Sequence, residues 1–271
     1  MKSGNSSQTP AKRWAAAGAV VQGALHIRND KPCQDALIIP KSEDGSFAIA
    51  CVADGHGSAS CPYSDEGALE AVRLVSKLLK DIMEQGIQEA HSTLTACKDI
   101  RLPKQIETMW NRLTETLHEN KGRTEGYSST LYGTTLLAAL ATDDFLFALQ
   151  IGDGDILLVD TDGLARHVFP DYVHIGEDTE SLCMKDSWQY IKTTLIPWDV
   201  SGGSPMVMLS TDGYANSFVD GAGLLKAGAD FYSIWQNDGL EPINENLSDW
   251  LRESSDKGSG DDISLALIVK N

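Results

Sequence analysis

The sequence has little positive charge. It contains 22 Lys and Arg residues against 39 Asp and Glu residues, which gives a formal net charge of −17 at pH 7. A chain this acidic is repelled by the phosphate backbone of nucleic acids and by the anionic headgroups of a membrane surface. The charge therefore argues against both nucleic acid and membrane as partners.

Cysteines and long apolar runs are also scarce. The five cysteines are odd in number and no Cys-x-x-Cys pair occurs, so neither a disulfide framework nor a structural zinc site is expected. No apolar run approaches the ~18 residues of a membrane span, and residues 1–13 lack the apolar core of a signal peptide. We expect a soluble, cytoplasmic protein.

What is present is the composition of an ordinary globular protein, with 42% hydrophobic and 23% charged residues in a chain of 271. Residues 1–12 are polar and predict a disordered tail. No internal repeat and no long linker divides the remainder, so residues 13–271 are expected to form a single domain.

The spacing of apolar residues predicts the main elements. Short apolar runs between turn residues predict strands at 14–25, 36–39, 47–53, 136–141, 145–151, 156–159, 206–209 and 263–269. Helical spacing predicts helices at 68–82, 106–117, 224–235 and 243–251. Residues 161–204 have scattered Gly, Asp and Pro and predict a loop-rich insertion. This order favours an α+β fold, in which two sheets have helices outside them.

Five acidic residues stand at the ends of predicted strands. Asp54, Asp153 and Asp212 each follow an apolar run and precede a Gly, while Asp35 and Asp261 come shortly before such a run. An Asp-Gly pair is ordinarily a tight turn, but five strand-end carboxylates can also converge at one rim of the sheets. Like charges brought together are costly unless cations neutralise them, and Mg²⁺ and Mn²⁺ prefer oxygen ligands. The pattern indicates a divalent metal centre.

One histidine accompanies these carboxylates. His56 lies two residues after Asp54, and a Gly on either side leaves its imidazole uncrowded. A His with a pKa near neutrality can donate a proton to a leaving group. His26 shows no such context and is interpreted as a structural or surface residue. The Gly-Thr-Thr run at 133–135 leads into a strand and fits either a plain turn or close packing at the site.

Five motifs carry a family resemblance. They are Val-Ala-Asp-Gly-His-Gly at 52–57, Gly-Thr-Thr at 133–135, Ile-Gly-Asp at 151–153, Leu-Ser-Thr-Asp-Gly at 209–213 and Asp-Asp-Ile-Ser at 261–264. In this order they resemble the metal-dependent type 2C protein Ser/Thr phosphatases, and the resemblance extends from residue 18 to the C-terminus. It implies two packed antiparallel β-sheets, a β-sandwich, flanked by α-helices on both sides. It also implies a bacterial-type, stand-alone catalytic domain.

The resemblance further implies roles for the strand-end residues. Asp54 would bridge two metal ions, and the carbonyl of Gly55 would bind the second ion. Asp212 and Asp261 would bind the first ion, and Asp35 would hold waters on the metals. The cofactors would be Mg²⁺ or Mn²⁺, two per active site.

The remaining implied roles concern a third ion and the reaction. Asp153, together with Asp212, would serve a weaker third metal ion, and His56 would be the general acid for the departing serine or threonine oxygen. The implied reaction is hydrolysis of phosphoserine and phosphothreonine by a metal-activated water, with no covalent phosphoenzyme. Phosphorylated proteins would be the substrates, with a Ser/Thr kinase or its targets as biological partners.

The sequence departs from the family at the position that binds phosphate. Asp30 stands where the family has an Arg, five residues before Asp35. Arg28 is the candidate phosphate-binding residue in its place. His26 stands in the same stretch, where a bacterial-type branch of the family favours a His.

Two alternative functions differ from this interpretation. The first is a catalytically weak or inactive member of the same fold that binds or senses a partner; the complete set of proposed ligands argues against it. The second is a haloacid dehalogenase phosphatase, because Asp160 to Gly163 are similar to the start of that group, whose first Asp is a covalent nucleophile. The strand–helix alternation and later Lys of that group are missing, so a turn between two strands is the better interpretation of this segment.

Overall fold

The computed structural model describes residues 13–40, 42–170, 179–198 and 203–270. The predicted tail and parts of the predicted loop-rich insertion lie outside these residues. The strands are β1 (Trp14–Val21), β2 (Asp35–Ile38), β3 (Ala48–Asp54), β4 (Leu136–Ala141), β5 (Phe145–Ile151), β6 (Asp155–Val159), β7 (Ala165–His167), β8 (Lys192–Pro197), β9 (Met206–Ser210) and β10 (Ile263–Lys270). The helices are α1 (Ala24–Arg28), α2 (Ser64–Met83), α3 (Ile87–Cys97), α4 (Arg101–Asn120), α5 (Asp212–Ala215), α6 (Gly221–Asp238) and α7 (Glu241–Lys257), with 3₁₀ turns η1 (Ser129–Tyr132) and η2 (Ser187–Gln189).

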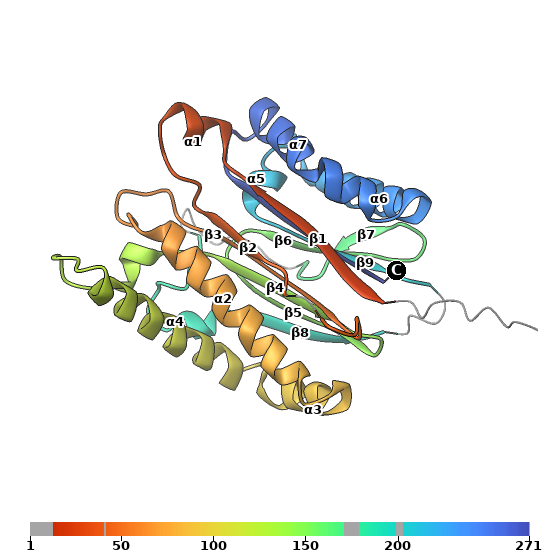
Figure 1. The fold of residues 1–271 in the computed structure, drawn as a ribbon, viewed down its shortest axis with the longest axis horizontal. Coiled ribbons are helices and arrows are strands. Elements are labelled where there is room, and N and C mark those ends of the chain that lie inside the picture. Colours follow the sequence, from red (N-terminus) through yellow and green to blue (C-terminus); the bar gives the residue numbers. More distant parts are fainter. Residues whose placement is uncertain (1–12, 41, 171–178, 199–202, 271) are drawn as a thin grey trace, which may run out of the picture.

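These elements form four layers (Figure 1). One sheet has the order β1-β10-β9-β6-β7 and the other β2-β3-β4-β5-β8, and every pairing in both is antiparallel. Helices α2 to α4 pack on the outer face of the second sheet, while α5 to α7 pack on the outer face of the first. The predicted fold class, a sandwich of two antiparallel sheets with helices on both sides, is confirmed. Among the helices of the described ranges, none combines the length and apolar character that a bilayer crossing requires.

Strand β3 shows why the central strands read as unbroken apolar runs. Ile49 and Cys51 face the core beneath α2 to α4, whereas Ala50 and Val52 face the core between the two sheets. All four side chains are fully buried. A strand with helices on one face and a second sheet on the other has no polar side, because side chains alternate between its faces.

The structure corrects the predicted elements in three places. The first strand ends at Val21, and the short helix α1 follows where a strand was expected to continue. Helix α3 was not predicted, because only Ala90, Leu94 and Cys97 of its residues are buried and this stripe is short. The insertion contains strands β7 and β8; β8 is an edge strand that pairs only with β5 within the described sheet, and its mixed side chains are half-buried.

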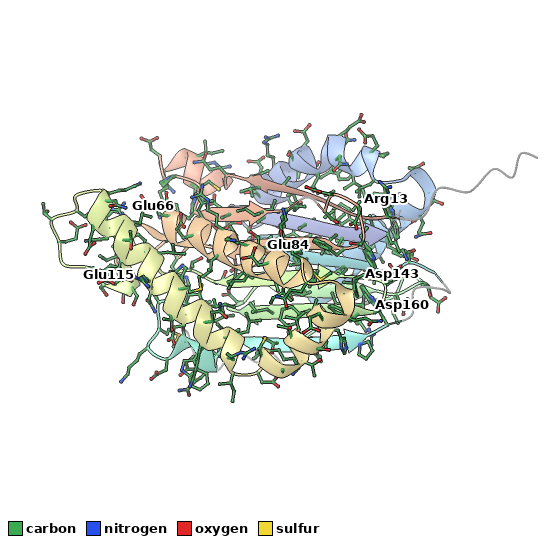
Figure 2. The ribbon with its side chains drawn as sticks, turned by 60° about the horizontal axis from the view of Figure 1, so that its bottom comes forward. Arg13, Glu66, Glu84, Glu115, Asp143 and Asp160 are labelled. Carbon is green, nitrogen blue, oxygen red and sulfur yellow. The ribbon has the colours of Figure 1, made fainter. Side chains whose placement is uncertain are left out.

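The two sheets are joined at one end by an aromatic and polar cluster. Trp14 of β1 stacks on Trp198, which follows β8 of the other sheet, with ring centroids 5.5 Å apart. The Trp14 Nε1 donates a hydrogen bond of 2.8 Å to Asp143, and Lys270 forms an ion pair of 2.8 Å with the same carboxylate. Figure 2 shows Asp143 toward one end of the molecule and Glu66, at the start of α2, toward the other. The cluster closes the end that is opposite to the acidic strand ends described below.

Close packing between α2 and η1 generates a prediction about stability. A Cβ on Gly67 would lie 1.9 Å from the carbonyl oxygen of Tyr132, and the Gly67 carbonyl already accepts a hydrogen bond of 3.0 Å from Trp110. We expect Gly67→Ala to lower the free energy of unfolding by about 1–3 kcal/mol, the usual cost of overpacking. Denaturant unfolding measures the change.

Gly126→Ala is the matched control, since a Cβ at Gly126 would meet nothing within 4 Å. It should change the free energy of unfolding by no more than about 0.5 kcal/mol. Equal stability of the two variants would contradict the packing described for Gly67.

Candidate active site

Strand direction brings five chain segments to one end of the sandwich. Strands β3, β5 and β9 end there and β2 and β10 begin there, because neighbouring strands run antiparallel. Asp35 and Asp54 are direct register partners in the β2–β3 pair. In the other sheet, Ser210 at the end of β9 pairs with the start of β10 on one side and with Asp155 of β6 on the other. The acidic residues of both sheets therefore meet at one rim.

Asp54 is held by the Gly-Thr-Thr segment. The backbone N–H of Asp54 donates to Thr135 Oγ1 at 2.9 Å, and its carbonyl accepts from the Thr134 hydroxyl at 2.9 Å and the Thr135 N–H at 2.8 Å. Of the two interpretations of this run, the structure shows close packing at the site. Gly55 packs against the start of α2, where a Cβ would lie 2.6 Å from the carbonyl oxygen of Ser64. A larger residue at Gly55 would displace α2 from the site.

A threonine links the two sheets beneath the carboxylates. The Thr211 hydroxyl donates to Asp35 Oδ2 at 2.8 Å and accepts from the backbone N–H of Ser264 at 2.9 Å. Thr211 precedes Asp212, whose Oδ2 accepts from the side-chain amide of Asn216 at 3.0 Å. This link keeps the Asp35 carboxylate of one sheet beside the β9 end of the other.

The carboxylates raise one another's proton affinity. Burial, and then the neighbouring charges of Asp35 and Asp212, raise the pKa of Asp54 well above its ordinary value. Burial also raises the pKa of Asp35, although the Thr211 hydrogen bond acts in the opposite direction. Burial and the charge of Asp153 raise the pKa of Asp212 to about 6. Without cations, this set of groups cannot all be ionised at low cost.

His56 and four of the carboxylates share one pocket of about 610 Å³. The carboxylates are Asp54, Asp153, Asp212 and Asp261. The His56 backbone N–H donates to the Gly133 carbonyl at 3.0 Å, and burial lowers the pKa of its imidazole. The described residues that line this pocket include no Lys and no Arg. An anion could not bind here on side-chain charge alone.

The oxygens of this pocket, and those of the neighbouring strand β2 whose Asp35 pairs with Asp54, fit divalent cations. Within the described part of the chain, Asp35 Oδ1, Asp212 Oδ1 and Gln34 Oε1 are buried and have no hydrogen-bond partner. A buried oxygen without a partner is costly, and a bound cation relieves that cost. The donor set is dominated by carboxylate oxygens, as Mg²⁺ and Mn²⁺ prefer.

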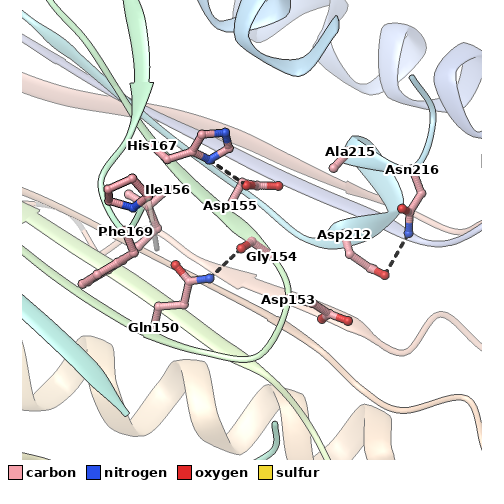
Figure 3. A pocket seen from close by; sticks show the side chains of 11 residues that line it. Gln150, Asp153, Gly154, Asp155, Ile156, His167, Phe169, Asp212, Ala215 and Asn216 are labelled. Atoms are coloured by element: carbon pink, nitrogen blue, oxygen red, sulfur yellow. Dashed lines mark hydrogen bonds and ion pairs between the residues drawn. The ribbon is translucent and has the colours of Figure 1, made fainter. Parts of the chain in front are cut away.

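A second pocket of about 410 Å³ adjoins the first (Figure 3). The two pockets share Asp153 and Asp212. In the second pocket, the wall opposite these two residues contains Phe169 and an ion pair of 3.0 Å between His167 and Asp155. The hydrogen bond to Asp155 raises the pKa of His167. Asp155 is thus paired with His167 in the second pocket and does not line the first.

Arg28 and His26 differ from their sequence-based predictions in where they lie relative to the pocket. Arg28 forms an ion pair of 3.1 Å with Asp256, both side chains are about two-thirds exposed (63% and 65%), and Arg28 is not among the residues that line the pocket. Its predicted phosphate-binding role would require this ion pair to open. His26, interpreted from the sequence as structural or surface, lines the pocket beside Asp261. The only sequence signal for His26 is the family resemblance, in which a bacterial-type branch favours a His in this stretch; the fold is what places it in the pocket.

The segment similar to haloacid dehalogenases is a turn. Asp160 Oδ1 accepts hydrogen bonds of 3.0 Å from the backbone N–H groups of Asp162 and Leu164, and the chain passes from β6 into the antiparallel strand β7. The strand–helix step that a covalent Asp nucleophile requires does not occur at Asp160.

The comparisons with known proteins agree with this fold. The family model described as Protein phosphatase 2C matches residues 22–252. The match covers most of the chain, which therefore belongs to the protein phosphatase 2C family. The predicted family is confirmed, and so is the predicted enzyme class, a phosphoprotein phosphatase. No curated protein sequence matches the chain significantly.

Solved structures share the fold at low sequence identity. The serine/threonine phosphatase of S. agalactiae is 16% identical with a TM-score of 0.59, over 94% of this chain and 98% of that one. The catalytic domain of the phosphatase PstP, in complex with two manganese ions, is 17% identical with a TM-score of 0.59, over 96% of this chain and 100% of that one. RsbX in complex with magnesium is 15% identical with a TM-score of 0.53, over 97% and 98%.

Because the carboxylates repel one another, replacing one of them should stabilise the metal-free protein and weaken its binding of metal ions. We expect Asp54→Asn to raise the melting temperature of the chelator-treated protein, because it removes one of the buried groups that repel each other when ionised. Mn²⁺ at about one hundred times its Kd should stabilise the wild type by about 2.7 kcal/mol, and should stabilise the variant much less. Thermal unfolding with chelator and with Mn²⁺ measures both effects.

Asp162→Asn is the control for charge, because Asp162 is exposed in the β6–β7 turn. It should leave both melting temperatures unchanged. A response of Asp54→Asn to Mn²⁺ as large as that of the wild type would remove Asp54 from the metal site.

Proposed function

We propose that the protein hydrolyses phosphoserine and phosphothreonine in proteins, with two divalent cations and no covalent phosphoenzyme. The observation that carries this proposal is a pocket that has four carboxylates and no Lys or Arg in its described lining, and in which Asp212 Oδ1 is buried without a hydrogen-bond partner. Such a pocket can bind a phosphate dianion only after cations have neutralised it. The manganese and magnesium in the solved PstP and RsbX structures support Mg²⁺ or Mn²⁺ as these cations.

The proposed ligands divide between the two sheets. Asp54 would bridge the two ions, with the Gly55 carbonyl on the second. Asp212 and Asp261 would hold the first ion, and Asp35 would hold water through its unpartnered Oδ1. When bound, the cations supply an acidified water and neutralise charge on the phosphoryl oxygens. The protein itself fixes the positions of these ligand oxygens, because they lie at strand ends that buried hydrogen bonds hold in place.

Two further groups would act on the substrate side. Asp153 and Asp212 border both pockets and would bind a weaker third ion. His56 lines the same pocket and would donate a proton to the departing serine or threonine oxygen. The two adjoining pockets leave room for a polypeptide segment next to the phosphoryl group, which supports phosphoproteins, such as a Ser/Thr kinase or its targets, as substrates. All five cysteines are free thiols, which supports a reducing, cytoplasmic setting.

An inactive binding or sensing module is the second candidate. The observation that favours it is the absence of a cationic phosphate ligand from the described pocket lining. Metal binding without turnover on any phosphoester would establish it.

The assay that tests the proposal uses nitrophenyl phosphate and a phosphothreonine peptide with Mn²⁺, with Mg²⁺ and with excess chelator. We expect turnover of both substrates with either metal and none with chelator. Asp54→Asn and Asp212→Asn should each reduce turnover to the uncatalysed background, whereas Asp162→Asn should match the wild type. Loss of activity in Asp162→Asn with full activity in Asp54→Asn would overturn the site assignment.

The general-acid role of His56 predicts a dependence on the leaving group. His56→Ala should slow hydrolysis of the phosphothreonine peptide by about 10²–10⁴-fold, because an alkoxide leaves poorly without a proton. Nitrophenyl phosphate should lose far less, since nitrophenolate needs little protonation. Steady-state rates on both substrates decide the point, and equal losses would exclude His56 as the acid.

A further inference from the structure

His26 lies between two acidic side chains at the edge of the pocket. Its Nδ1 is 2.9 Å from Asp262 Oδ2, and its Nε2 is 3.5 Å from Asp261 Oδ1. The His26 side chain is only 14% exposed, and Asp262 is buried. His26, Asp261 and Asp262 each offer a ligand atom within 4.8 Å of the others. Asp261 is also one of the proposed ligands of the first ion.

The hydrogen bonds of Asp262 determine how the imidazole is oriented. Asp262 Oδ1 accepts from the backbone N–H of Gly23 at 2.6 Å, and Oδ2 accepts from the backbone N–H of Gln34 at 2.6 Å. Both oxygens of Asp262 thus already act as hydrogen-bond acceptors for backbone donors. We therefore assign the contact with His26 Nδ1 as a donation from the ring to Asp262.

With the Nδ1 proton on this hydrogen bond, Nε2 is the ring atom whose lone pair can bind a metal ion. Its neighbour Asp261 Oδ1 already accepts from the backbone N–H of Asp262 at 2.9 Å. The 3.5 Å between Nε2 and Oδ1 is longer than a good hydrogen bond. Two ligands that bind one ion at about 2.1 Å and at right angles lie about 3 Å apart, so a small closure would bring both atoms onto one cation.

We propose that His26 Nε2 is a metal ligand beside Asp261, and that Asp262 orients it through Nδ1. A carboxylate that accepts the second ring N–H is the usual support of a metal-binding histidine. The inference rests on the proposed metal centre and adds one nitrogen to its oxygen ligands. Mg²⁺ is a hard cation that takes oxygen ligands, so a nitrogen ligand disfavours it and favours Mn²⁺ as the first ion when the two are at equal concentration.

Pulsed EPR of the full chain loaded with Mn²⁺ tests the ligand directly. We expect strong coupling between the Mn²⁺ spin and one imidazole nitrogen in the wild type. The coupling should disappear in His26→Gln and persist in His56→Ala and in His91→Ala, whose histidine lies on α3. Melting temperatures of the chelator-treated variants check that each is folded.

Equilibrium binding of Mn²⁺ and Mg²⁺ provides a second readout. Asp262→Asn keeps the shape of the side chain but removes the carboxylate that orients His26, and it should weaken Mn²⁺ binding by about 10–100-fold, with a smaller loss for Mg²⁺. Retained nitrogen coupling in His26→Gln, or Mn²⁺ bound to the wild type with no such coupling, overturns His26 as a ligand and leaves the proposed function intact. Failure of the wild type to bind Mn²⁺ and Mg²⁺ overturns both.

Discussion

The repulsion between buried carboxylates is the constraint on which the rest of this structure depends. Asp35 and Asp54 are paired across one sheet, and Asp212 approaches them from the other. An arrangement of this kind costs stability in the protein alone and becomes favourable only with bound cations. Hydrogen bonds to the backbone beside the carboxylates offset part of that cost, as those of Thr134 and Thr135 to the backbone of Asp54 do.

The sandwich supplies the rigidity that such a site requires. The core between the sheets combines small side chains, such as Ala50 and Ala139, with larger ones, such as Leu137 and Ile268. Two further cores fasten the helices to the outer faces. Strand ends that emerge from three packed cores have little freedom to relax away from one another. Carboxylates on flexible loops would instead separate, and the electrostatic cost that favours metal binding would be lost.

The acidic character of the chain also determines how the proposed substrate's phosphate would be bound. The chain is strongly negative, and Asp30 stands where the family has its phosphate-binding Arg. Arg28 is engaged with Asp256 on the surface. The positive potential at the pocket would therefore come from the cations, so that substrate affinity and metal occupancy are coupled. A protein built this way has little affinity for phosphorylated surfaces unless its metals are in place.

The sequence by itself determined the central strands, the long helix α2 and the strand-end positions of the acidic residues, because each depends on local periodicity or on a motif of a few residues. The tertiary structure alone decided the edge strand β8, which exists because β5 offers it hydrogen bonds, and helix α3, whose few apolar residues meet a core built elsewhere. It also decided that Arg28 turns to Asp256 and that His26 meets Asp261 and Asp262, more than two hundred residues away in the chain. Contacts between residues so far apart depend on strand register and layer packing, which no local pattern specifies.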